Sequence, residues 1–217
     1  MIFVYGYVFY YIAALIGISI GYHRYFTHRS FQTSSSLEIL MLFFGRICGG
    51  RSALTWAAVH RMHHANSDTE NDPHSPKFVG AWNVITSSWK VHTIPRKHIV
   101  DLLKNPRVRF FHDFGRDIHI AYAILMLMCG IDIFFIFVVM PFVLSWAGFG
   151  ILNYLTHKDG KPKDIPILNL IAPGEGWHKY HHDNPRAHRL NKFDIAGKVI
   201  EKFFDKSKHS SQNFSNT

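Results

Sequence analysis

HRYFTH at 23–28, HRMHH at 60–64 and HKYHH at 178–182 are three histidine clusters that lie far apart in the chain. On a helix, positions i, i+3 and i+4 fall on one face, so each H-x-x-H-H cluster can aim three imidazoles at one point. His23 and His28 are five residues apart, roughly 140° around an α-helix, which fits a loosened helix end or two different metals. Neutral imidazole is a common ligand of iron, copper, zinc and nickel. Eight such side chains exceed what one metal can take, which favours a site with two metals.

The composition indicates a membrane protein. Of the 217 residues, 47% are hydrophobic and 15% aromatic, and the apolar residues form long blocks instead of alternating. The net charge of +9 does not indicate a nucleic-acid partner, because the basic residues lie beside apolar spans, where the positive-inside rule accounts for them. The two cysteines, Cys48 and Cys129, form no iron–sulfur or haem-attachment pattern, so any electrons must come from a separate protein.

Three apolar stretches are predicted to cross the membrane, at about 1–20, 116–130 and 133–155. About 20 residues suffice to cross a bilayer core, and the last two stretches form a hairpin that turns near Gly130–Asp132. Basic residues follow the first span and none precedes it, so its end is expected to face the cytoplasm. All three histidine clusters then lie on the cytoplasmic side of the membrane.

A further apolar stretch, residues 37–56, is predicted to stay out of the membrane. If it crossed, HRMHH would lie on the opposite side from HRYFTH and the site could not assemble. It also carries Glu38, Arg46 and Arg51, which are costly at the bilayer centre. We expect a helix that lies inside the cytoplasmic domain or at the interface and leads into HRMHH.

The remaining residues are expected to form a cytoplasmic cap from 21–115 and 156–205. The stretch after Phe193 is amphipathic and fits a helix on the membrane surface or on the domain itself. The tail at 209–217 is expected to be disordered.

The histidine clusters and their surroundings resemble the membrane fatty acyl desaturases, in particular the acyl-CoA desaturase-like branch. The matching stretches are GYHRYFTHRSF, HRMHHANSDTENDPHSP, NYLTH at 153–157 and GEGWHKYHHDNP. The resemblance runs from about Val8 to Ile200. It implies an all-α integral membrane protein in which residues 1–217 form a single desaturase domain, with transmembrane helices topped by a cytoplasmic cap that holds a dinuclear metal site.

The resemblance also implies the metal ligands, which in this family are nine histidines and an asparagine that holds a metal-bound water. Carried over by motif, they are His23, His28, His60, His63, His64, His157, His178, His181 and His182, with Asn153 for the water. Asn153 and His157 are i and i+4, so they face the same side of the last span. Their spacing alone leaves open a lone interfacial histidine and an asparagine that joins two helices.

The implied activity is that of an oxygen-dependent fatty acyl desaturase. Such an enzyme inserts a cis double bond into a long-chain acyl thioester or lipid, using two iron ions, O2 and an external electron donor such as ferredoxin or a cytochrome. Ala58 stands where the acyl-CoA enzymes have an arginine that touches CoA, so a carrier protein or a lipid ester stays open as the acyl carrier. Of the helical hairpin that precedes the first cluster in this family, only the second half is expected here.

Carboxylates are expected to orient some ligand histidines by accepting hydrogen bonds from their N–H groups. Glu175 and Asp72 are the candidates, although Asp72 also fits a turn and Glu175 a helix start. Asp68 and Glu70 fit a solvated loop better. The other histidines lack ligand spacing and are interpreted as surface or loop residues: His74, His92, His98, His112, His119, His188 and His209.

Two other functions fit the same clusters. A membrane hydroxylase or alkane monooxygenase uses similar histidines, although the DTENDPH and GEGWHKYHH contexts favour desaturation. A non-catalytic membrane metal-binding protein needs the ligands but no substrate tunnel. Zinc could replace iron in it, because histidine nitrogen discriminates poorly between these metals.

Overall fold

The computed structural model describes residues 1–91 and 93–205, and within these ranges it contains helices and no β-strand. His92, His209 and the tail expected to be disordered lie outside the described residues. In chain order, with η marking 3₁₀ or π segments, the elements are α1 (Ile2–Ala14), η1 (Leu15–Thr27), α2 (Ser35–Ile47), α3 (Ala53–Asn66), α4 (Pro76–Val79), α5 (Ala81–Ile85), η2 (Arg96–His98), η3 (Leu102–Lys104), α6 (Pro106–Asp113), α7 (Gly115–Met128), α8 (Ile131–Phe134), η4 (Phe135–Val139), α9 (Met140–His157), η5 (Pro166–Leu170), α10 (His178–Asp183), α11 (Ile195–Val199) and η6 (Ile200–Phe204).

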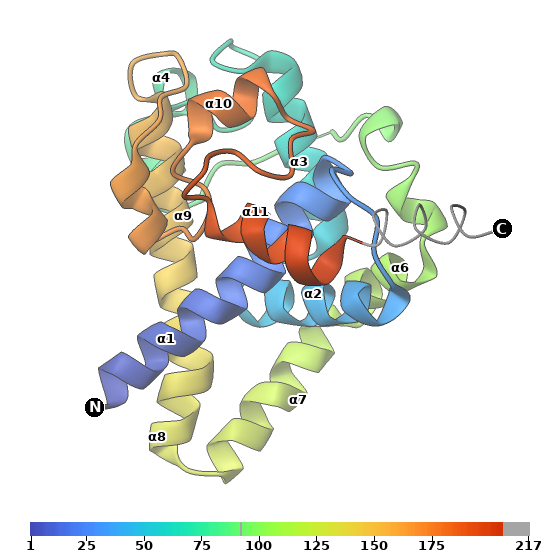
Figure 1. Cartoon of the computed structure of the whole chain (residues 1–217), viewed down its shortest axis with the longest axis vertical. Helices are drawn as coiled ribbons and strands as arrows, with labels where there is room; N and C mark the ends of the chain where they lie inside the picture. Colours follow the sequence, from blue (N-terminus) through green and yellow to red (C-terminus); the bar gives the residue numbers. More distant parts are fainter. Residues whose placement is uncertain (92, 206–217) are drawn as a thin grey trace, which may run out of the picture.

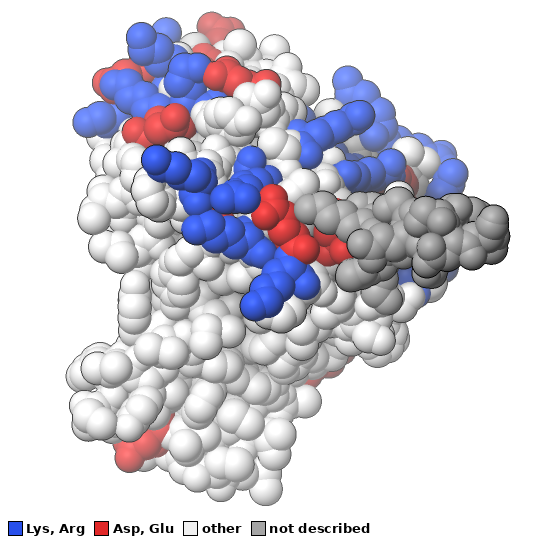
Figure 2. All heavy atoms as spheres, in the orientation of Figure 1, with Lys and Arg blue, Asp and Glu red and all other residues white. Residues whose placement is uncertain are grey.

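The molecule has a narrow stem and a wider head (Figure 1). We define the stem as α7, α8, η4 and the start of α9, and the head as the part that contains α3, α10 and α11. Lys and Arg side chains cover the head in Figure 2, and the stem on this face carries none. Two helical runs, Ile2–Thr27 and Ile131–His157, are long and apolar enough to cross a bilayer. α7, at 14 residues, spans only about 21 Å. The all-helical class is confirmed, and the membrane crossings stay predictions.

The stem is a helical hairpin. The chain reverses at Cys129 and Gly130, next to the predicted turn, and Gly130 has a φ of 131° that side chains with a Cβ rarely adopt. The Tyr122 hydroxyl on α7 donates to the Phe137 carbonyl on the returning leg at 3.0 Å. The hairpin is joined to α1 by the Phe9 ring, whose centroid lies 4.7 Å from that of Phe137.

The apolar stretch 37–56 lies in α2 and in the start of α3, the helix that bears HRMHH. α2 ends at Ile47, and the turn that follows contains Gly49 and Arg51 at φ values of 77° and 56°. Ser52 then caps α3, because its side chain accepts a hydrogen bond from the Thr55 backbone N–H. The bend lets α2 pack along η1 while α3 carries HRMHH into the head.

The amphipathic stretch after Phe193 packs on the domain. Ala196, Ile200 and Phe204 on α11 and η6 are buried, and α11 contacts η1. Phe193 and Phe203 remain exposed on the other side.

A buried ion pair joins η1 to the C-terminal loops. Arg24 is 1% exposed, and its Nη1 lies 2.7 Å from the Oδ2 of Asp194. The same guanidinium donates to the carbonyls of Gly174 and His188 at 2.7 and 2.8 Å. Arg24 therefore fixes the loop that leads into α10.

Replacing Arg24 with Gln is expected to lower the free energy of unfolding by about 3–5 kcal/mol, because Asp194 is left as an unpaired buried charge. Thermal unfolding of the purified protein measures the loss. The control is Arg29→Gln, whose side chain is 64% exposed and pairs with Asp101. That change is expected to cost no more than about 1 kcal/mol. Equal losses in the two variants would contradict the assignment.

Candidate metal centre

The described residues bring nine histidines together in two adjacent groups. One ring nitrogen from each member lies within 4.8 Å of those of the other members of its group. The first group is His23, His28, His60, His64 and His181, and the second is His63, His157, His178 and His182. Each group draws on sequence clusters that lie far apart in the chain.

Each H-x-x-H-H cluster divides between the groups, so the expectation that it aims all three imidazoles at one point is wrong. On α3, His60 and His64 are about 40° apart around the helix, whereas His63 lies about 60° away from His60 in the opposite direction. His60 and His64 join the first group and His63 joins the second. On α10 the i and i+4 pair, His178 and His182, shares the second group.

His23 and His28 belong to one group because the helix that bears them is widened. η1 is a π-helix, and the His28 backbone N–H donates to the His23 carbonyl, an i to i+5 bond of 3.2 Å. A π-turn brings residues five apart onto nearly the same face. Of the two possibilities left by the sequence, the structure has the loosened helix.

The spacing of the nitrogens fits metal ligation. The Nε2 of His181 lies 2.9 Å from the Nε2 atoms of both His23 and His64. In the second group, the Nε2 atoms of His157 and His178 are also 2.9 Å apart. Two nitrogens bound at about 2.1 Å to one metal at a right angle would be about 3.0 Å apart.

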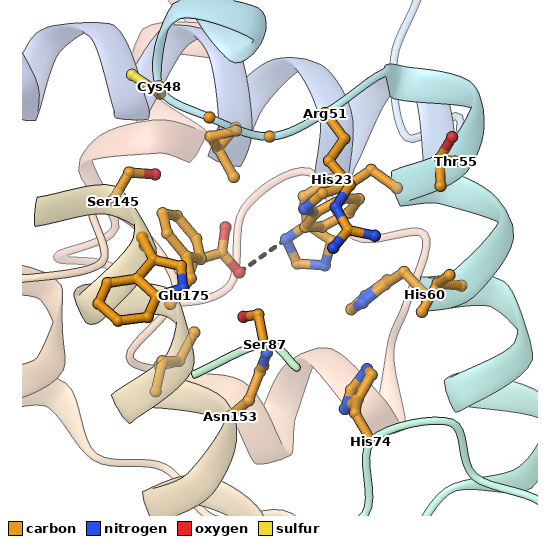
Figure 3. A pocket seen from close by; sticks show the side chains of 18 of the residues that line it. His23, Cys48, Arg51, Thr55, His60, His74, Ser87, Ser145, Asn153 and Glu175 are labelled. Carbon is orange, nitrogen blue, oxygen red and sulfur yellow. Dashed lines mark ion pairs between the residues drawn. The ribbon is translucent and has the colours of Figure 1, made fainter. Parts of the chain in front are cut away.

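Three carboxylates contact the opposite ring nitrogens of three histidines. The Nδ1 of His63 lies 2.9 Å from Asp72, and the Nδ1 of His157 lies 3.0 Å from Asp68. The Nδ1 of His23 lies 2.7 Å from the Oε2 of Glu175, the contact drawn as a dashed line in Figure 3. Glu175 and Asp72 therefore lie where a role in orienting ligands requires them. The solvated loop expected for Asp68 is wrong, whereas Glu70 is exposed.

The turn between Asp68 and Asp72 explains why sequence reasoning missed Asp68. Asp68 has a φ of 61°, and its backbone N–H donates to the Asp72 side chain at 2.8 Å. This conformation folds the loop back against α3 and α9. Nothing in the residue pattern specifies it.

His74 was also missed, because it lacks ligand spacing. It is 4% exposed, not a surface residue, and its ring stacks on that of His63 with centroids 4.2 Å apart. Asp72 accepts a hydrogen bond from the His74 backbone at 3.0 Å. His63, Asp72 and His74 thus form a third set of possible ligand atoms that shares His63 with the second group.

Burial lowers the pKa of eight of these imidazoles and so favours their neutral form: His28, His60, His63, His64, His157, His178, His181 and His182. Burial, followed by the neighbouring histidines, lowers the pKa of His64 to about 3 and that of His182 to about 2. Burial would raise the pKa of Glu175, but His23, Arg24 and Ser19 hold it below its usual value. Burial raises the pKa of Asp72 to about 6, so this carboxyl is still largely ionised at neutral pH.

The arrangement of the ring nitrogens suits a bound cation. An ionised carboxylate only accepts hydrogen bonds, so it fixes the proton on Nδ1 and leaves the lone pair on Nε2. His63 and His157 therefore present lone pairs toward the Nε2 atoms of their neighbours. A metal ion between such nitrogens would accept their lone pairs. The donor set fits a divalent transition metal in each group.

A cavity of about 460 Å³ opens beside the first group. Its wall includes His23, His60 and His178, and it extends to Phe142 and Trp146 on α9. The side chain of Asn153 also faces this cavity, and it has no protein hydrogen-bond partner among the described residues (Figure 3). This is a suitable place for an amide that holds a water.

These features define a protein that is all-helical over its described residues, with two histidine groups that could each hold a metal ion beside a cavity large enough for a small ligand. The sequence profile described as fatty acid desaturase matches residues 1–208. The chain therefore belongs to the membrane fatty acid desaturase family, as the resemblance predicted, and its relatives are oxidoreductases.

Curated relatives include acyl-lipid and acyl-CoA desaturases. The chain is 30% identical to an sn-1 stearoyl-lipid 9-desaturase of Anabaena variabilis, over 80% of this chain and 68% of the relative. It is 31% identical to the enzyme of that name from Synechocystis sp., over 82% of this chain and 59% of the relative. It is 30% identical to acyl-CoA desaturase 1 of Saccharomyces cerevisiae, over 84% of this chain and 39% of the relative.

Proposed function

We propose that this protein is an oxygen-dependent fatty acyl desaturase whose nine histidines hold two iron ions. The observation that carries the proposal is the convergence of nine imidazole nitrogens into two adjacent groups beside one cavity. Two groups of four and five nitrogens match the ligand needs of two ions. Iron is the metal of choice because family membership points to redox chemistry, for which zinc is unsuited.

The reaction removes two hydrogens from unactivated methylenes, which no side-chain acid or base can do. Bound iron, reduced by an external electron-transfer protein, would supply the oxidant while O2 is reduced to water. The protein must hold the acyl chain and exclude water. Apolar cavity residues such as Ile18, Phe149 and Leu152 serve both purposes. Asp68 and Asp72 keep the protons of His157 and His63 on Nδ1, and Glu175 lies 2.7 Å from the Nδ1 of His23.

The acyl chain is proposed to enter from a membrane. The absence of Lys and Arg from residues 117–157 and their abundance in the head support a stem within the bilayer and a cytoplasmic head. Ala58 is 0% exposed, so this position offers no contact to a CoA headgroup. A lipid ester or a carrier-protein thioester fits this surface better.

Lipids from a host that lacks desaturases and expresses this chain test the proposal. Gas chromatography is expected to find a new monounsaturated acyl chain, with the double bond located by derivatisation. A product that is only hydroxylated would assign the protein to the membrane hydroxylases. If no product formed despite an added electron donor and O2, the result would favour a non-catalytic metal-binding protein.

Removal of the metal is expected to lower the melting temperature of the purified protein, because a ligand that binds only the folded state stabilises it. The measurement is thermal unfolding before and after treatment with a chelator, followed by addition of ferrous iron. Iron is expected to restore the melting temperature at about two ions per chain. Restoration by zinc with no iron in the isolated protein would argue against an iron enzyme.

A further inference from the structure

The cavity beside the first histidine group contains two arginines, Arg46 and Arg51. The carboxylate on the cavity wall, Glu175, is already bonded to His23 and Ser19. The cavity therefore has a positive charge that no lining residue neutralises. A hydrocarbon chain by itself does not need such a charge.

Neither arginine has a carboxylate partner among the described residues. Arginines inside the head elsewhere are paired: Arg24 with Asp194, Arg61 with Asp101 and Arg107 with Glu38. Arg46 is half-buried, and its Nε is buried with no hydrogen-bond partner. Its Nη1 donates only to the Arg51 carbonyl, at 3.0 Å. A buried donor without a partner is costly, so an external acceptor is expected here.

The backbone aims Arg51 into the cavity. It has a φ of 56°, a conformation that disfavours side chains with a Cβ and that occurs more often at functional sites. In Figure 3 the Arg51 side chain extends from the turn before α3 across the cavity toward His23 and His60. Arg51 is an exposed residue whereas His23 is 1% exposed, so the cavity wall runs from an exposed arginine to a buried histidine.

The mouth lies where the head meets the stem. A Cβ on Gly115, the first residue of α7, would lie 3.5 Å from the Nε of Arg46. The Nδ1 of His119, one turn further along α7, lies 3.3 Å from the carbonyl oxygen of Arg46. Phe142 and Trp146 on α9 line the cavity and are exposed at this level. With the stem in a bilayer, this is the depth of the lipid headgroups.

We propose that Arg46 and Arg51 bind the phosphate of a membrane glycerophospholipid, one acyl chain of which extends from the mouth to the histidine groups. Two guanidinium groups suit a phosphodiester, because their N–H groups match its oxygens in pairs. The position at the stem favours a lipid over a soluble carrier. This inference deepens the proposed function and rests on it for the identity of the acyl substrate.

The test measures binding separately from turnover. Full-length protein, as isolated with its metal, is titrated with stearoyl-containing phosphatidylglycerol and with a galactolipid of the same chains, and native mass spectrometry follows binding. Wild-type protein is expected to bind the phospholipid at least about tenfold more tightly. Arg51→Gln is expected to abolish the difference and Arg46→Gln to reduce it. Arg109→Gln, an exposed arginine outside the cavity, is the matched control and is expected to have no effect.

Stearate and stearoyl-CoA, titrated in parallel, distinguish the sources of the anion. An arginine-dependent preference for either of them over the phospholipid would overturn the assignment to a lipid phosphate. Equal affinities of the wild type for phospholipid and galactolipid would overturn the site altogether. Arginine-dependent binding of the phospholipid without any desaturated product would support the inference and sink the proposed reaction. Gln and Arg disfavour the positive φ of position 51 to a similar extent, so Arg51→Gln is expected to fold like the wild type.

Discussion

Replacement of His63, His157 or His181 by Ala is expected to reduce desaturated product to background. Each change removes one nitrogen from a set whose members lie within 4.8 Å of one another. Product formed by a host expressing each variant provides the measurement. His98→Ala is the control, because that side chain lies outside both groups.

Iron content separates a lost site from a lost fold. His157 belongs to the group of four, so its removal leaves three nitrogens, whereas loss of His181 leaves four in the other group. We therefore expect His157→Ala to lose about one iron per chain and His181→Ala to lose less, with both proteins still inserted in the membrane. Retained turnover in all three variants would show that the metal centre lies elsewhere.

The candidate ligand histidines were predictable from the sequence because the short spacing within each cluster is typical of metal ligands. On a helix, H-x-x-H-H places its histidines on one side, and the resemblance added His157 and Asn153 from a separate stretch. The division of each cluster between two groups depends on where α3 and α10 face each other. The contact between α3 and α10 joins residues more than a hundred positions apart in the chain, and no local sequence pattern specifies it.

The helical class was predictable for a similar reason, since long apolar blocks with a break at Gly130 indicate a hairpin. The position of the turn between α2 and α3 was not, because Arg51 adopts a left-handed conformation there that its residue type disfavours. The positions of Asp68 and His74 beside the histidine groups were not predicted for the same reason, an unusual backbone conformation. Their positions follow from a turn after α3 that contains a second non-glycine residue with positive φ, Asp68 itself. Such strain becomes visible only in the folded chain.

The carboxylates that contact the histidines are expected to be nearly as important as the ligands. Asp72→Asn is predicted to weaken metal binding or activity by about 10–100-fold, because such partners fix the tautomer and orientation of a ligand. The side chain of Asp72 accepts hydrogen bonds from the His63 ring and from the backbones of Asp68 and His74. An amide group would turn one acceptor into a donor that faces another N–H, so the ring of His63 would lose its fixed position.

Asp68→Asn is expected to have a smaller effect than Asp72→Asn, because Asp68 holds one ligand, His157, and the oxygen of an amide can still accept the hydrogen bond from its Nδ1–H. Glu70→Gln, an exposed carboxylate in the same loop, is the matched control and should behave as wild type. Iron release to a competing chelator, measured beside product formation, ranks the three variants. If Glu70→Gln weakened iron binding as much as Asp72→Asn, the effect would come from the charge of the loop and not from the contact with His63. The predicted order, with Asp72 first, Asp68 second and Glu70 without effect, follows from how many donors each carboxylate satisfies beside the histidine groups.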